Sequence, residues 1–242
     1  MSFHPSVVIG LALLGGLYLY LGGRAASRRR QGAFAGALFV LLVALNGPIH
    51  ELSDHSLFSV HMGQHLLLTL LFPPLLIAGT PGWLFSPLLR IGPVRAVARL
   101  LTRPVVAAVL YSVTIAVWHL TPFYELMMRS HDVHIATHLM FIVAATILWF
   151  PVMSPVPELP RLSYGTGMLY LFLVGIPMQI VAAMITLADE VLYPWYTAAP
   201  RTWGLTPIAD QQLGGLLMWV PGNLWMFLAI GVLFFKWAKE TG

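Results

Sequence analysis

Two pairs of histidines have the spacing that places both side chains on one face of a helix. His61 and His65 are four residues apart, and His134 and His138 repeat that spacing later in the chain. Residues four apart are neighbours on a helix surface. Two such pairs on adjacent helices can build a metal site inside a helix bundle, and imidazole binds copper, zinc and iron. The pattern therefore predicts a metal centre between two helices, with interhelical hydrogen bonding between the histidines as the structural alternative.

Other side chains are candidates to complete or support this centre. His119 could add a ligand or hold one in place, and Met62 offers a thioether, a soft ligand that suits copper. Asp210 could orient a histidine, although a carboxylate at a helix start is equally well explained by capping and by the helix dipole. His50 and His55 precede the first pair and could guide an ion toward it. The sequence leaves open the participation of His4, His50, His55 and His131.

The composition limits the kind of protein that can carry this centre. Of the 242 residues, 58% are hydrophobic and only 9% are charged, whereas a soluble domain averages about a quarter charged residues. Because so few charges cannot cover a globular surface, we expect a multi-pass membrane protein. The chain has no cysteine, which excludes disulfides, thiolate metal ligands and thiol nucleophiles. The basic residues are scattered among short loops and do not indicate a nucleic-acid partner.

The apolar runs predict an all-α bundle of seven transmembrane helices, with residues 1–242 forming a single domain. The predicted spans are 7–21, 32–49, 56–78, 104–120, 132–150, 164–188 and 210–235. Pro73 and Pro74 remove two backbone donors and predict a kink in the third span. The segment 79–103 mixes apolar residues with arginines, which indicates either an amphipathic surface helix or a solvated basic loop. The segment 189–209 is rich in Trp, Tyr and Pro, as is typical of an interfacial aromatic belt.

The distribution of charge orients these helices. With the N-terminus outside, the inner segments hold eleven of the thirteen lysines and arginines, and only Arg129 and Arg201 lie outside. Because cytoplasmic loops are enriched in Lys and Arg, we expect an outer N-terminus and a cytoplasmic C-terminus. In this topology all nine histidines and seven of the nine carboxylates fall on the outer side, although the histidines were not used to orient the helices. The predicted centre therefore lies near the outer face of the membrane.

Several motifs, taken in order along the chain, resemble one membrane-protein family. They are His-Met-Gly-Gln-His at 61–65 followed by an apolar run and Pro73-Pro74, Trp118-His119, His134-x-x-x-His138, Trp-Phe-Pro-Val at 149–152, and Asp-Gln-Gln-Leu-Gly-Gly-Leu-Leu-Met-Trp at 210–219. From about residue 50 to residue 225 the chain resembles the polytopic CtaG-like (caa3-type) cytochrome c oxidase assembly factors. The first two spans add little to the resemblance.

The resemblance implies a seven-helix protein of the bacterial cytoplasmic (inner) membrane that is needed to assemble haem-copper oxidases and is not itself an enzyme. Copper delivery to the oxidase is the usual inference for such proteins. The implied partners are oxidase subunits and the lipid bilayer, with periplasmic copper chaperones as suppliers of the metal. The family's site residues carry over to His61, His65, His119, His134, His138 and Asp210. His50 and His55 lie outside the matching motifs.

Two other functions use the same residues. A zinc-dependent intramembrane hydrolase would hold zinc with three histidines and a water, and Asp210, Glu125 or Asp189 would act as the base. A bis-histidine haem protein would take one axial histidine from each helix, although two i, i+4 pairs supply more histidines than haem needs. The sequence does not determine the metal, its oxidation state, a carrier or scaffold role, the oligomeric state or the target subunit.

Overall fold

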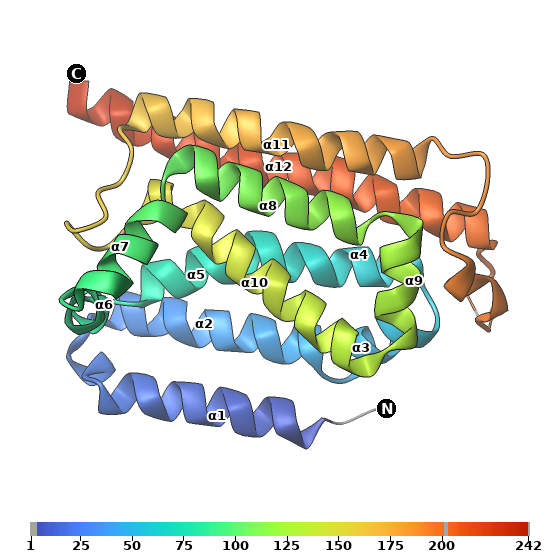
Figure 1. Cartoon of the computed structure of the whole chain (residues 1–242), viewed down its shortest axis with the longest axis horizontal. Coiled ribbons are helices and arrows are strands. Elements are labelled where there is room, and N and C mark those ends of the chain that lie inside the picture. The colour runs from blue at the N-terminus through green and yellow to red at the C-terminus, as the bar shows by residue number, and fades with distance from the viewer. Residues whose placement is uncertain (1–3, 201–202, 242) are drawn as a thin grey trace.

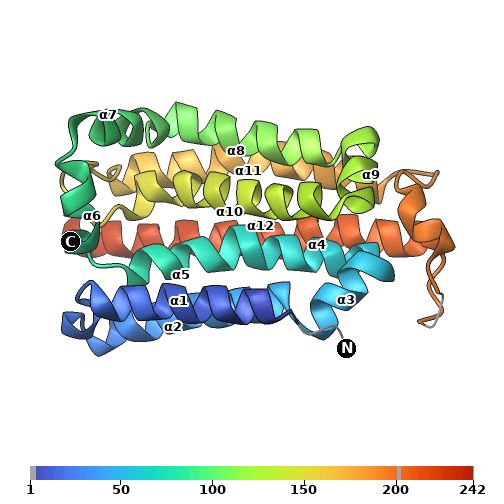
Figure 2. The ribbon, with the colours of Figure 1, turned by 60° about the horizontal axis from the view of Figure 1, so that its bottom comes forward.

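The computed structural model describes residues 4–200 and 203–241, and all regular structure in this described part is helical. The predicted all-α class is therefore confirmed. The long helices lie side by side along one direction and form one elongated bundle (Figures 1 and 2). Consecutive long helices run in opposite directions, so the chain repeatedly crosses from one end of the bundle to the other (Figure 1). Arg201, one of the two basic residues predicted on the outer side, lies outside the described residues.

Several helices begin at residues that favour a helix start. Pro5 and Pro104 stand in the first turn, where the missing N–H has no helical partner to lose. Ser130 caps its helix by accepting a hydrogen bond from the backbone N of Val133 at 3.5 Å. The elements are α1 (Pro5–Tyr20), η1 (Gly23–Ala25), α2 (Arg28–Leu45), α3 (Pro48–His55), α4 (Phe58–Leu66), η2 (Leu67–Leu71), α5 (Phe72–Gly79), α6 (Gly82–Leu89), α7 (Gly92–Leu101), α8 (Pro104–Trp118), α9 (Thr121–Arg129), α10 (His131–Met153), α11 (Tyr164–Thr186), η3 (Pro194–Ala198) and α12 (Pro207–Thr241).

The described part contains four to six candidate membrane spans. Four helices are long and apolar enough to cross a bilayer: the continuous helix Phe58–Gly79, α10, α11 and α12. Two bent pairs, α2 with α3 at 41° and α7 with α8 at 69°, raise the number to six if each pair forms one span. α1 is apolar but has only 16 residues, about 24 Å of helix, whereas a bilayer core is about 30 Å thick. If the total is seven spans, as predicted, α1 must supply the additional one.

The proline pair in the third span changes the winding of the helix. Residues Leu67–Leu71 form the π-helix η2, directly before Pro73 and Pro74. Because Pro73 has no N–H, the carbonyl of Thr69 loses its usual helical partner. Trp149 of α10 replaces that partner, since its Nε1 donates to the Thr69 carbonyl at 3.1 Å. Where the sequence predicts a kink, the helix instead widens into a π-helix, and an indole from another helix stabilises this turn.

The arginine-rich segment 79–103 folds as two short helices, α6 and α7. None of the α7 residues is buried, and α7 meets α8 at an angle of 69°. The amphipathic surface helix is therefore the better of the two interpretations. α6, α7, η1 and the C-terminus lie at the same end of the bundle, while α3, α9 and the segment around η3 lie at the other (Figures 1 and 2). The segments predicted to carry most of the basic residues thus share one end.

Two tyrosines of the aromatic segment 189–209 pack inside the bundle, whereas Trp203 of the same segment is 60% exposed. Tyr193 and Tyr196 are each only 2% exposed and belong to the main hydrophobic core. Their phenol rings fold over the end of the bundle and stack among Phe58 and Tyr124. The Tyr193 hydroxyl donates to the carbonyl of His119, and the Tyr196 hydroxyl donates to the carbonyl of Ser53. Neither hydroxyl therefore needs a hydrogen bond from water or a lipid headgroup.

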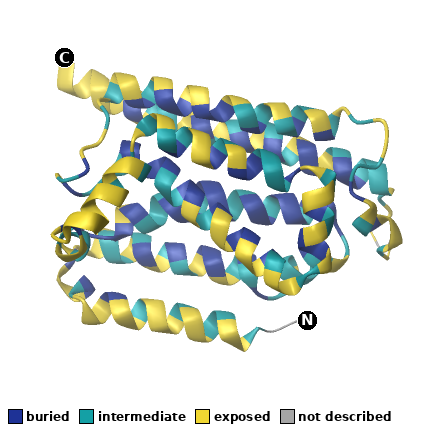
Figure 3. Ribbon diagram, viewed as in Figure 1, coloured by how far each residue is buried: buried dark blue, intermediate teal, exposed yellow. Residues whose placement is uncertain are grey.

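The outward faces of the long helices are apolar. Leu13 of α1, Val105 of α8 and Val220 of α12 are more than half exposed, and exposed residues line the outer sides of the peripheral helices (Figure 3). A soluble protein rarely exposes apolar surface this continuously, whereas lipid is a favourable environment for it. Together with the candidate spans, this surface identifies a membrane protein.

Small residues bring α12 close to two neighbours, as its adjacent glycines predict. A Cβ on Gly214 would lie 2.6 Å from the ring of Phe58 in α4, and a Cβ on Gly215 would lie 2.7 Å from the backbone N of Thr186 in α11. Real Cβ atoms essentially never approach other heavy atoms within 3.0 Å. These glycines therefore fix the position of α12 against both helices.

A matched pair of glycine substitutions in α12 tests this contact. Gly215→Ala is expected to destabilise the bundle by about 1–3 kcal/mol, because α11 must move to admit the methyl group. Gly231→Ala has no neighbour within 4 Å and should be neutral or slightly stabilising, since alanine is the better helix former. Thermal unfolding in detergent compares the two. Equal melting temperatures for both variants would contradict the close approach.

Candidate metal centre

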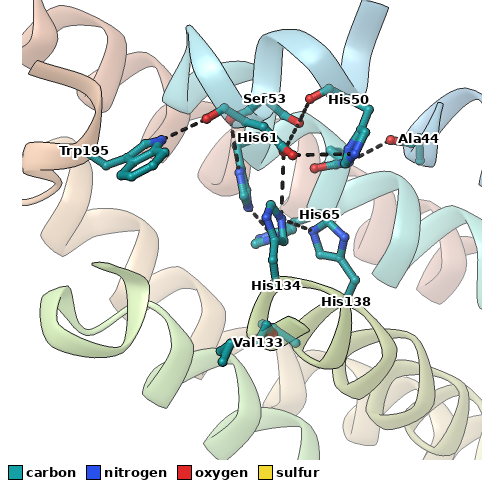
Figure 4. Close-up of polar contacts among 12 residues, drawn as sticks. Ala44, His50, Ser53, His61, His65, Val133, His134, His138 and Trp195 are labelled. Atoms are coloured by element: carbon teal, nitrogen blue, oxygen red, sulfur yellow. Dashed lines mark hydrogen bonds and ion pairs between the residues drawn. The ribbon is translucent and has the colours of Figure 1, made fainter. Parts of the chain in front are cut away.

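The two histidine pairs predicted from their spacing face each other between α4 and α10 (Figure 4). In the α4 pair the Nε2 atoms of His61 and His65 are 2.9 Å apart, and in the α10 pair those of His134 and His138 are 3.2 Å apart. All four side chains are buried. Buried imidazoles at these distances satisfy one another through N–H···N hydrogen bonds, and an ion bound between them would replace those bonds.

Three of the four form a group with metal-ligand spacing. One ligand nitrogen each from His61, His134 and His138 lies within 4.8 Å of the other two, and we call this group the triad. In a tetrahedral site with metal–nitrogen bonds of 2.0–2.1 Å, ligand nitrogens lie about 3.4 Å apart. The separations in the triad are close enough that small side-chain rotations would reach that geometry. The donor set therefore fits a metal that accepts imidazole.

A chain of hydroxyl groups sets the orientation of His61. Tyr196 donates its proton to the carbonyl of Ser53 at 2.7 Å, so its oxygen is left to accept. Tyr124 lies 3.0 Å from that oxygen, and His61 Nδ1 lies 3.1 Å from it. Burial raises the pKa of Tyr196 well above its usual value, so the hydroxyl keeps the proton that it donates.

These contacts assign the proton of His61 to Nδ1, which donates to Tyr196 or to the Ser53 carbonyl at 3.4 Å. The lone pair then lies on Nε2, which faces the other histidines. Metal-binding histidines are usually held in this way, with the second ring nitrogen donating to a fixed acceptor. Without an ion, His65 Nε2–H can donate to that lone pair.

His119 stands behind the α4 pair. Its Nδ1 donates to the carbonyl of Ile115 at 2.7 Å, and its own carbonyl accepts from the Tyr193 hydroxyl at 2.9 Å. The ring centroids of His119 and His65 are 5.8 Å apart. Within the described residues, the buried atoms His119 Nε2 and His65 Nδ1 have no hydrogen-bond partner. Each of these two nitrogens can therefore accept a hydrogen bond or bind an ion.

Asp210 contacts α4 at a distance from the histidine rings. Its fully buried carboxylate accepts hydrogen bonds from the backbone N of Phe58 at 2.8 Å and from Ser59 N and Oγ at 3.1 and 2.6 Å. The residue at the N-cap position of α4, Leu57, supplies no side-chain cap. Asp210 therefore caps α4 from another helix and holds the helix that carries the first histidine pair.

The remaining candidates from the sequence lie in different surroundings. Met62 is fully buried and packs against α12 at Gly214. His50 lies at the outer edge of the centre, where its Nε2 is 3.5 Å from a carboxylate oxygen of Asp54 and its Nδ1 is 3.3 Å from Gln64 Nε2. His55 is exposed at the end of α3. His50 thus lies at the histidine cluster, and His55 lines an outer cavity of about 310 Å³ together with His50, Asp54 and His134.

Sequence reasoning did not identify Tyr124 or Tyr196 as residues of this site. Asp54 lies between His50 and His134, and the tyrosines hold His61 from a distant part of the chain. The only local signal was the aromatic and proline content around 193–196. Spacing along one helix could not reveal these contacts, because their partners lie on other elements.

Comparison with known proteins identifies the family. A family model described as cytochrome c oxidase caa3 assembly factor matches residues 15–240. The chain belongs to this family. The resemblance seen in the sequence motifs is therefore confirmed, and it extends over the first spans as well. The histidine pairs and Asp210 lie within the matched region of the assembly-factor family.

The similar proteins in this comparison are bacterial. Uncharacterised proteins of Mycobacterium bovis and Mycobacterium tuberculosis are each 27% identical over an alignment of 248 residues, gaps included, that covers 91% of this chain and 37% of each relative. An uncharacterised protein of Mycobacterium leprae is 25% identical over an alignment of 202 residues, gaps included, that covers 76% of this chain and 30% of the relative. The chain therefore spans well under half the length of the curated relatives that it matches. No solved structure matches the chain.

Proposed function

We propose that this chain is a non-enzymatic assembly factor that binds a copper ion as cargo and delivers it to a cytochrome c oxidase. The observation that carries the proposal is the triad of buried histidines from two helices in a chain whose family is described by oxidase assembly. His61, His134 and His138 would hold the ion. Imidazole suits both Cu(I) and Cu(II), and the absence of thiolate ligands favours an ion that can be released.

The surrounding residues support reversible binding. The Tyr196 and Ser53 contacts hold His61 with its lone pair toward the triad, so little reorganisation is needed when an ion arrives. The buried ring of Phe141 packs on the ring of His65, with centroids 4.6 Å apart, and limits the access of water from the bundle interior. His65 and His119 carry unpartnered nitrogens beside the triad, where they would stabilise the ion's water or supply a further ligand.

We also propose the topology expected from charge: seven spans in the bacterial cytoplasmic membrane, one domain, an outer N-terminus and a cytoplasmic C-terminus. In support, the elements around the histidines, α3 and α9, lie at one end of the bundle, and the arginine-rich α7 lies at the other (Figure 2). The ion would then be held near the outer surface. Periplasmic copper chaperones would supply it there, and an oxidase subunit would receive it.

The contacts favour copper delivery over the two alternatives. Of the proposed hydrolase bases, Asp189 is exposed. Asp210 is used to cap α4, and Glu125 accepts from Trp195 N and pairs with Arg129. Neither contact involves the triad. For haem, the space between α4 and α10 is filled by four histidine rings with centroid distances of 5.4–5.9 Å between the helices, which suits an ion better than a macrocycle.

A deletion strain tests the delivery role. In a bacterium that makes this chain and a haem-copper oxidase, deletion is expected to abolish the activity of that oxidase and its bound copper, because the cofactor is not inserted. A copper-free quinol oxidase in the same membranes serves as control and should keep its activity. Excess copper in the medium should partly restore the oxidase if the chain acts by delivery. Full oxidase copper in the deletion strain would contradict the proposal.

A further inference from the structure

The carboxylate of Asp54 lies between two histidines at the outer edge of the triad. Its Oδ2 is 3.5 Å from His50 Nε2 on the same helix, and its Oδ1 is 3.9 Å from His134 Nε2 on α10. Both distances are too long for a direct hydrogen bond. They match the separation of two ligands on one metal ion, which is about 3.4 Å at a tetrahedral centre and about 4 Å across a linear one.

The protein holds this carboxylate in place from two sides. Ser53 Oγ donates to Asp54 Oδ1 at 3.0 Å, and Trp195 Nε1 donates to the Asp54 backbone carbonyl at 2.8 Å (Figure 4). The side chain of Asp54 remains 17% exposed and that of His50 15% exposed, whereas His61 is fully buried. The pair on α3 is thus reachable from solvent, and the triad lies behind it.

A cavity connects this pair to the triad. It has a volume of about 330 Å³, and its titratable lining residues are His4, His50, Asp54, His131, His134 and His138. His134 and His138 are members of the triad and also face this cavity. The His4 ring packs edge-on against His50, with centroids 4.7 Å apart, and helps to hold it. An ion entering the cavity would meet Asp54 and His50 before it reached His138.

We propose that His50, Asp54 and His134 form an outer binding position that captures the copper ion and passes it inward to the triad. This inference rests on the proposed function. His134 is the shared ligand, since its Nε2 lies 3.9 Å from Asp54 Oδ1 and 3.2 Å from His138 Nε2. Gln64 Nε2 donates to His50 Nδ1, so His50 Nε2 carries the ring proton and releases it to solvent when it binds the ion. In the transfer, the ion exchanges its bonds to Asp54 and His50 for bonds to His138 and His61 while His134 stays bound, and His50 Nε2 takes a proton back from solvent. No electron is transferred, and the oxidation state of the ion is unchanged.

The two positions differ in the way that such a transfer requires. The outer position contains a carboxylate, whose charge attracts a cation from solution over several ångströms. The triad contains only imidazole, a softer ligand set that holds copper better than a carboxylate does. The ion is therefore attracted at the outer position and retained at the inner one.

Loading kinetics of the purified full-length chain test this proposal. The metal-free protein in detergent is mixed anaerobically with Cu(I) in acetonitrile-containing buffer, and uptake is followed against a coloured Cu(I) chelator. Asp54→Asn and His50→Gln are each expected to slow loading at least tenfold and to leave the final copper content unchanged. Asp132→Asn, which removes an exposed carboxylate in the first turn of α10 that does not line the cavity, should load within about twofold of the wild type. Added salt should slow the wild type but not Asp54→Asn.

The outcomes separate this inference from the proposed function. If Asp54→Asn and His50→Gln both load as fast as the wild type, the outer position is wrong, even though the triad can still bind copper. If the wild type binds no Cu(I), the proposed function itself fails. A structural ion pair without a role in capture would change the melting temperature of these variants but not the loading rate or its dependence on salt.

Discussion

Replacing His61 and His138 together by alanine is expected to lower the affinity of the purified chain for Cu(I) at least about 100-fold. Changing a residue that merely supports a metal ligand typically costs 10–100-fold in affinity, and this variant removes two ligands of the triad. Their remaining partner, His134, would keep only one triad nitrogen near the ion. Competition with a Cu(I) chelator measures the affinity, and elemental analysis of copper and zinc identifies the bound metal.

The control for this experiment is His55→Ala, because His55 is an exposed histidine on a neighbouring helix. It should bind copper within about twofold of the wild type, since it supplies no ligand to the triad. Circular dichroism must show the same helix content for both variants. Equal copper binding by the double variant and the wild type would refute the triad as the site, and a haem absorption band lost with the two histidines would favour the haem alternative.

Replacing Asp210 by alanine is expected to lower the free energy of unfolding by about 3 kcal/mol or more. The substitution leaves the backbone N–H groups of Phe58 and Ser59 buried without acceptors, and each unsatisfied buried donor costs about 1–3 kcal/mol. The first turn of α4 should then loosen, and copper affinity should fall although no ligand has been removed. Asp210→Asn keeps one acceptor oxygen and should lie between alanine and the wild type.

Chemical unfolding in mixed detergent micelles measures this effect. Asp132→Ala is the matched control, because Asp132 stands in the first turn of α10 but is exposed. It should cost less than about 1 kcal/mol, the usual range for a surface carboxylate at a helix start. If Asp210→Ala unfolds like Asp132→Ala, the capping contact across helices contributes nothing to stability.

The features that the sequence predicts well are those encoded within one helix. The i, i+4 spacing of His61 with His65 and of His134 with His138 predicted two pairs on two helices, and the structure places the pairs opposite each other. Pro73 and Pro74 predicted the irregular third span for the same local reason. The long apolar runs predicted an all-helical membrane protein, since only helices satisfy the backbone within such runs.

The supporting contacts could not be predicted because they join residues far apart in the chain. Asp210 reaches Ser59 across 151 positions, and Tyr196 reaches His61 across 135 positions. Asp210 was predicted to act at its own helix start or on a histidine, and the aromatic segment was predicted to lie at the membrane interface. In both cases the side chain bonds to an unpaired backbone group at the end of another helix. The sequence of that helix does not indicate which distant side chain will supply the bond.

The π-helix η2 has a geometric consequence for the third span. One residue of an α-helix corresponds to about 100° of rotation, so a wider turn at Leu67–Leu71 shifts the angular phase of everything after it. α4 packs mainly on α12 and α3, whereas α5 packs mainly on α2 and α10. α4 and α5, the two halves of this span, can therefore turn their buried faces in different directions. The face of α4 that carries His61 and His65 can point toward α10, while α5 keeps the direction that its packing against α2 requires.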